Sequence, residues 1–115
     1  MKNETEKNLF GICPYFTSQK VLSGKWALLI LHHLAEQTLR FKELERELAP
    51  ITQATLTKQL RNLEEHGLIN RTVYNTIPPK VEYSLSELGW QFKPVLDSLE
   101  KWGDLYIAHM EKKEV

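Results

Sequence analysis

The feature that most constrains the fold of this chain is a very short turn, residues 49–51, between two amphipathic segments. The apolar residues of these segments recur at the spacing of one helix face. They are Phe41, Leu44 and Leu48 in the segment 41–49, and Leu56, Leu60 and Leu63 in the segment 52–66. Pro50 ends the first helix because a proline disfavours helical geometry in the preceding residue, and Thr52 is a suitable N-cap for the second. Two helices joined this closely predict a helix-turn-helix.

The face of the second helix opposite its leucines is short, polar and cationic. At 100° per residue this face carries Ala54, Lys58 and Arg61, with Gln53 and Thr57 on its flanks. Side chains of these types suit base edges and phosphates in a DNA major groove. Thr52 and Gln53 also lie at the helix N-terminus, where free N–H groups favour a phosphate. The alternative is that these cations only solvate a surface.

Two segments rich in β-branched and aromatic residues follow directly, at 69–74 and 80–85. The five residues between them include two adjacent prolines, which fix the backbone of an exposed tip. A two-stranded hairpin after a helix-turn-helix, followed by another helix, is the winged-helix topology. We expect this wing to lie beside the second helix and to contact DNA through Asn75, Thr76 and Lys80, with Arg71 near its base.

The remaining segments complete an α+β, mostly helical fold. We expect a helix at 14–22, an apolar helix at 25–36 that forms the buried centre, and an extended segment at 38–41. A long helix at 86–113 has Ser86 as its N-cap, and Pro94 should kink it or divide it in two. We expect a single domain over residues 1–115.

The long C-terminal segment carries an apolar stripe that extends beyond one small domain. A helix of about 27 residues is about 40 Å long. Its apolar residues recur every three or four positions: Leu88, Phe92, Val95, Leu99, Trp102, Tyr106 and Met110. This stripe predicts contact with a second copy of the chain, and the alternative is that it covers the sheet of its own subunit.

Composition restricts the class of protein less than the distribution of charge does. The formal net charge is zero, yet residues 25–81 hold eight Lys/Arg against six Glu, and residues 82–115 hold four against seven acidic residues. A mildly basic middle is compatible with a DNA partner. No apolar run approaches the ~20 residues that a membrane span needs, and the N-terminus lacks the apolar core of a signal peptide. We therefore expect a cytoplasmic protein.

Several of these stretches together resemble the HxlR-type winged helix-turn-helix transcriptional regulators, relatives of the MarR group. The resemblance covers residues 10–105. It rests on Cys13-Pro14, on LSGKWALLIL (22–31), on RFKELERELAPITQATLTKQLRNLEEHGLINR (40–71), on YNTIPPKVEYSLSELG (74–89) and on PVLDSLEKWG (94–103). The combination of Gly-Lys-Trp, Leu-Arg-x-Leu-Glu-x-x-Gly-Leu and Pro-Pro-x-Val-Glu-Tyr is specific to it.

The resemblance implies a homodimeric repressor that binds a two-fold-related operator in double-stranded DNA. Family members dimerise through the N-terminal and C-terminal helices. In this chain that implies an interface of Tyr15, Phe16, Leu99, Trp102, Tyr106 and Met110. Family members often carry Lys or Arg where this chain has Ala54. Base recognition should therefore depend more on Thr57, Lys58 and Arg61, and Ala54 suits contact with a thymine methyl.

Cys13 is the only cysteine, which excludes an intrachain disulfide. A position at the start of a helix makes an accessible thiol more reactive, and some regulators that this chain resembles sense oxidants or electrophiles through an N-terminal cysteine. An oxidised pair would have to join Cys13 of two subunits. The alternative is a cysteine packed at the dimer interface.

The sequence offers no pattern for metal binding, cofactor binding or catalysis. His32 and His33 point about 100° apart on a helix and do not converge on one ion. No nucleophile–histidine grouping, phosphate loop or carboxylate pair stands out. We therefore expect a regulator rather than an enzyme, without a cofactor and with an unidentified effector. The other alternative is a winged helix that binds proteins or RNA.

Overall fold

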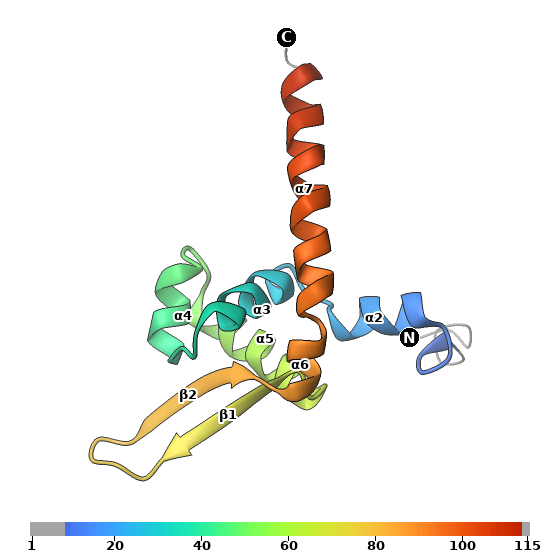
Figure 1. The fold of residues 1–115 in the computed structure, drawn as a ribbon. Coiled ribbons are helices and arrows are strands. Elements are labelled where there is room, and N and C mark those ends of the chain that lie inside the picture. Colours follow the sequence, from blue (N-terminus) through green and yellow to red (C-terminus); the bar gives the residue numbers. More distant parts are fainter. Residues whose placement is uncertain (1–8, 114–115) are drawn as a thin grey trace.

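The structure, a computed structural model, describes residues 9–113 and has the winged-helix order of elements (Figure 1). The helices are α2 (Pro14–Val21), α3 (Ala27–Glu36), α4 (Phe41–Glu47), α5 (Gln53–Glu65), α6 (Glu87–Gln91) and α7 (Lys93–Lys113). The strands are β1 (Ile69–Tyr74) and β2 (Lys80–Leu85). Both strands have the predicted bounds, and every predicted helix is present with ends that differ by one or two residues, except at the C-terminal end.

The two predicted N-caps are confirmed. The Thr52 hydroxyl accepts a hydrogen bond from the Thr55 N–H at 3.2 Å and begins α5. The Ser86 hydroxyl accepts one from the Gly89 N–H at 3.0 Å and begins α6, and it donates to the Gly67 carbonyl. Gly67 has a φ of 79°, the left-handed conformation that commonly ends a helix. The end of α5 is therefore tied directly to the start of the C-terminal segment.

The predicted C-terminal helix is divided in two, as its proline suggested. The break lies at Phe92, and Pro94 is the second residue of α7, where its missing N–H breaks no helical bond. α7 has 21 residues, which corresponds to about 30 Å. The helix after the break is therefore shorter than the length of about 40 Å estimated for the whole segment.

The sheet contains the wing and one short extension. β1 and β2 pair antiparallel from Ile69 opposite Leu85 to Tyr74 opposite Lys80. Leu39, in the predicted extended segment, bridges to Tyr83 on the other edge of β2 through two backbone hydrogen bonds of 3.0 and 2.8 Å. This bridge connects the loop before α4 to the base of the wing.

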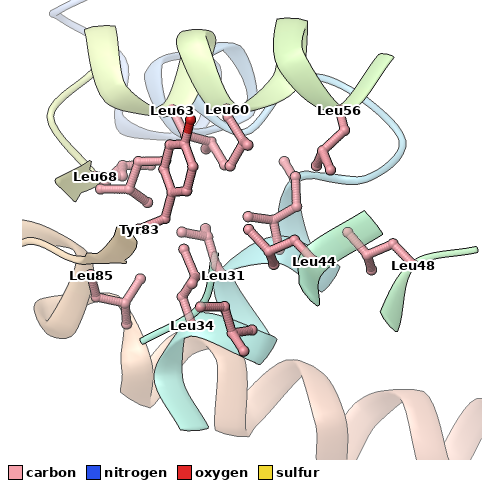
Figure 2. Close-up of a cluster of buried hydrophobic side chains, with 14 of the residues drawn as sticks. Leu31, Leu34, Leu44, Leu48, Leu56, Leu60, Leu63, Leu68, Tyr83 and Leu85 are labelled. Atoms are coloured by element: carbon pink, nitrogen blue, oxygen red, sulfur yellow. The ribbon is translucent and has the colours of Figure 1, made fainter. Parts of the chain in front are cut away.

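The core lies where α3, α4, α5 and the base of the sheet meet (Figure 2). Its centre is almost entirely aliphatic. The largest fully buried side chains are Ile30, Leu31, Leu34, Leu44, Leu56, Leu60 and Leu63. Tyr83 and Leu85 close it from β2.

The expectation that 25–36 forms the buried centre is correct for only one face of that helix. Ala27, Ile30, Leu31 and Leu34 are buried, but Leu28 and Leu29 are 40% and 45% exposed. The exposed pair lies on the face of α3 that lines a shallow groove with Leu96 and Leu99 of α7.

The wing, the distal part of α7 and α2 extend from this core in different directions (Figure 1). Among residues 9–113, no helix is long and apolar enough to cross a membrane.

Candidate nucleic-acid interface

The exposed face of α5 forms one side of a groove on the surface of the domain. The groove is lined by five of the residues expected to bind DNA, namely Gln53, Ala54, Thr57, Lys58 and Arg61. They share this surface because Leu56, Leu60 and Leu63 bury the opposite side of the helix. The structure therefore brings the predicted helix residues together on one accessible face.

Thr52 and Thr57, the two threonines predicted to bind DNA at or within α5, have hydroxyl groups that are already engaged. The Thr52 hydroxyl donates to the Thr55 hydroxyl at 2.8 Å while it caps the helix, and Thr52 does not line the groove. The Thr57 hydroxyl donates to the Gln53 carbonyl at 2.9 Å. Because each hydroxyl has one proton, in this arrangement Thr57 offers a DNA base an acceptor and a methyl group, but no donor.

The cations of α5 are free to meet an external anion. Within residues 9–113 the ion pairs are His32–Glu36, Lys80–Glu82 and Lys93–Asp97. Lys58 and Arg61 therefore have no carboxylate within 4 Å in that part of the chain. Glu65, in the last turn of α5, lines the same groove as Arg61.

The opposite wall of the groove was not anticipated from the sequence. It is formed by Ser23 and Gly24, in the loop between α2 and α3. The Gln59 side chain lies so close to Gly24 that a Cβ at that position would be 2.0 Å from its Nε2 atom. Gly24 also has a φ of 105°. The Gly-Lys-Trp motif is the sequence feature that could have indicated this wall. Its glycine, Gly24, allows the loop to approach the middle of α5.

The wing places its predicted residues along the hairpin. Arg71 is exposed on β1, and Asn75 and Thr76 are exposed at the tip. The Thr76 hydroxyl donates to the Pro78 carbonyl at 2.8 Å, which closes the tip on itself. Ile77 is fully exposed. The tip thus presents polar and apolar groups without a charge.

Lys80 differs from the other predicted cations because it already has partners. Its Nζ atom lies 3.7 Å from Oε2 of Glu82 and 4.8 Å from the centre of the Tyr74 ring. The Glu82 carboxylate, through a hydrogen bond and its charge, raises the pKa of the Tyr74 hydroxyl above its usual value of 10.0.

Most of the predicted dimer-interface residues are exposed to solvent. Tyr15, Leu99, Trp102, Tyr106 and Met110 are exposed, and Phe16 is half-buried. The Trp102 and Tyr106 rings lie 5.4 Å apart on one side of α7.

Cys13 is half-buried and stands at the N-cap position of α2. Within residues 9–113, no group of three or more His, Cys, Asp or Glu side chains could hold a metal ion.

Comparisons with known proteins agree with this geometry. The profile of the family described as HxlR-like helix-turn-helix matches residues 21–111. The chain is 43% identical over 105 residues to YdeP of Bacillus subtilis, an uncharacterized HTH-type transcriptional regulator, covering 91% of this chain and 82% of YdeP.

Two solved structures extend the similarity to the fold. The crystal structure of the regulator YtcD, a Bacillus subtilis protein, is 47% identical with a TM-score of 0.80 and covers 84% of this chain and 98% of its own. The redox regulator HypR in its reduced form is 38% identical with a TM-score of 0.81, covering 86% and 98%. The chain therefore belongs to the HxlR-like helix-turn-helix family of DNA-binding transcriptional regulators.

Proposed function

We propose that this protein is a homodimeric repressor that binds a two-fold-related operator, with α5 in the major groove and the wing on the adjacent backbone or minor groove. The observation that carries the proposal is the α5 groove, where Lys58 and Arg61 are exposed without an ion pair in residues 9–113. The second helix of a helix-turn-helix inserts in this manner.

The residues of α5 divide by chemistry into two roles. Arg61 and Lys58 suit guanine or phosphate, which both accept hydrogen bonds from cations. Ala54 and Thr57 present methyl groups that suit a thymine methyl. Contacts that orient the protein on the duplex are assigned to the wing residues Arg71, Asn75 and Thr76. At the N-terminus of α5, Thr52 and Gln53 are assigned a place near a phosphate.

Homodimerisation is supported by the exposed apolar face of α7. A soluble monomer does not usually leave a continuous apolar stripe in water. Pairing of two such faces around a two-fold axis would give the dimer two symmetry-related copies of α5, which matches an operator with two related half-sites. The predicted interface residues are Tyr15, Phe16, Leu99, Trp102, Tyr106 and Met110.

The decisive experiment replaces both cations of α5. The operator is first recovered by selection of bound sequences from random duplex DNA. Lys58→Ala/Arg61→Ala should then abolish specific operator binding in a mobility-shift titration and leave the dimer intact by sedimentation.

Lys101→Ala/Lys112→Ala is the matched control for that experiment. It removes two exposed cations from α7, and operator affinity should stay within about threefold of the parent. If the α5 variant binds the operator as tightly as the parent, α5 is not the recognition helix.

We also propose that Cys13 senses an oxidant or electrophile. Its place at the start of α2 and the similarity to a redox regulator, HypR, support this role. Oxidation would join Cys13 of two subunits, with two electrons and two protons passing to the oxidant.

The test treats the operator-bound protein with diamide or with an alkylating agent. We expect loss of operator affinity in the parent and none in Cys13→Ser. A mass shift on Cys13 with unchanged operator affinity would contradict the proposal.

A further inference from the structure

The stem of the wing carries a cluster of three side chains on one face of the hairpin. Tyr74 on β1 lies directly opposite Lys80 on β2, and Glu82 follows two residues later on the same strand. Residues two apart in a strand point to the same side of a sheet. The three side chains therefore gather at the point where the stem meets the tip.

Their contacts neutralise the only cation of the hairpin's outer part. Nζ of Lys80 lies 3.7 Å from the Glu82 carboxylate and over the Tyr74 ring. The Lys80 and Glu82 side chains are only 34% and 24% exposed, so the pair is partly shielded from solvent. The Tyr74 ring, whose centre lies 4.8 Å from Nζ of Lys80, forms the third side of the cluster.

Charge along the wing differs accordingly from charge along α5. Between Thr72 and Glu82 the sequence holds one cation, Lys80, and one anion, Glu82, so this part of the wing has no net charge. Lys58 and Arg61, by contrast, have no ion-pair partner within residues 9–113. A phosphate that approaches Lys80 competes with Glu82 for its ammonium group and also meets the negative charge of that carboxylate.

We propose that Glu82 is an affinity-limiting residue, which holds Lys80 in an internal ion pair and thereby keeps this lysine from contributing a phosphate contact. This inference rests on the proposed function, because it concerns the strength of DNA binding by the same surface. The proposal reverses the expectation, drawn from the sequence, that Lys80 contacts DNA. The wing's lysine contributes little to binding while Glu82 is present, and removal of the acid strengthens binding.

The test uses a random-sequence duplex of thirty base pairs, so that no operator has to be known. Dissociation constants of the parent and of Glu82→Gln are measured by fluorescence anisotropy over a series of KCl concentrations. One additional phosphate contact steepens the dependence of log K on log salt by about 0.9, which corresponds to roughly five- to tenfold tighter binding at about 0.1 M salt. We expect both changes in Glu82→Gln.

A double variant and a remote variant test whether the gain in affinity comes from Lys80. In Lys80→Met/Glu82→Gln the gain should disappear, because the released ammonium is absent. Glu100→Gln removes an acid from the exposed surface of α7 and should leave the salt slope unchanged. Glu82→Thr, with a residue suited to a strand, serves as a second variant if the glutamine variant unfolds at a lower temperature than the parent.

The outcomes separate this inference from the proposed function. If the parent fails to bind random duplex even at low salt, the proposed function fails. If the parent binds and Glu82→Gln binds equally or more weakly, Glu82 does not limit affinity, and the proposed function stands. If the double variant keeps the gain, the effect comes from the lost negative charge alone, and the role assigned to Lys80 is wrong.

Discussion

α5 and α7 have the same kind of amphipathic sequence, but their apolar faces differ in how far the fold buries them. The apolar stripe of α5 (Leu56, Leu60 and Leu63) is entirely inside the core. No residue of α7 is buried, and Trp102 is 62% exposed. The periodicity of a helix thus indicates that one face needs a partner, but it does not say whether that partner lies in the same subunit.

The difference follows from the position of each helix. α5 is covered by α3, α4 and the base of the sheet (Figure 2). Only the first turn of α7 reaches the core, where Leu96 packs against it, and the rest projects away from the domain (Figure 1). Substitutions in the two helices should therefore act on two different equilibria, folding for α5 and association for α7.

The largest effect is expected from Leu60→Ala in α5. Leu60 is 2% exposed, and loss of a buried leucine side chain with the cavity left behind costs about 2–5 kcal/mol of unfolding free energy. The measurement is urea unfolding at a fixed protein concentration. Leu105→Ala makes the same substitution at a site on α7 that is 70% exposed, and its effect should stay below about 0.5 kcal/mol. Equal losses at the two sites would remove the contrast between the helices.

Trp102→Ala should instead weaken association. If the exposed aromatic face of α7 pairs with its copy, removal of its largest side chain costs about 2 kcal/mol or more of dimerisation free energy. Sedimentation equilibrium measures this change as an increase in the dimer dissociation constant. Lys101→Ala, at the neighbouring exposed position, is the control and should leave that constant within about twofold. A dimer unaffected by Trp102→Ala would place the interface elsewhere.

Gly24→Ala tests the contact between the α2–α3 loop and the Gln59 side chain of α5. A Cβ at Gly24 would meet the Gln59 amide at 2.0 Å, and its φ of 105° disfavours any side chain. We expect a loss of about 1–3 kcal/mol in unfolding free energy. Gly67→Ala has a similar φ of 79° but open space around the added Cβ, so it measures the backbone strain alone. Adding Gln59→Ala to Gly24→Ala should recover the steric part of the loss, and no recovery would show that Gln59 simply moves aside.

The contrast also shows how far the sequence predicts the molecule. Both strands and the Thr52 and Ser86 caps follow from local chemistry, since turns, prolines and caps act within a few residues. The contacts of Gln59 with Gly24 and of Lys80 with Glu82 are set by packing between segments or by side-chain rotamers, which no periodicity encodes.

Burial on α3 was overestimated for a similar reason. Its uniform run of apolar residues conceals which face meets the core, and Leu28 and Leu29 turned out to be exposed. Uniform hydrophobicity thus does not identify which face of a helix packs into the core of its own subunit.

The smallest expected effects come from the polar ends of the two helices. Thr52→Ala removes the hydroxyl that accepts the Thr55 N–H at 3.2 Å and should cost about 1 kcal/mol of unfolding free energy. Asp97→Asn breaks the exposed pair in α7, where Lys93 and Asp97 approach to 2.6 Å, and should cost about 0.3–0.5 kcal/mol. Urea unfolding at low and high salt distinguishes the two, because only the ion pair is screened. A salt-dependent loss in Thr52→Ala would mean that this residue stabilises α5 through charge, since a neutral hydrogen bond at a helix N-terminus does not respond to ionic strength in that way.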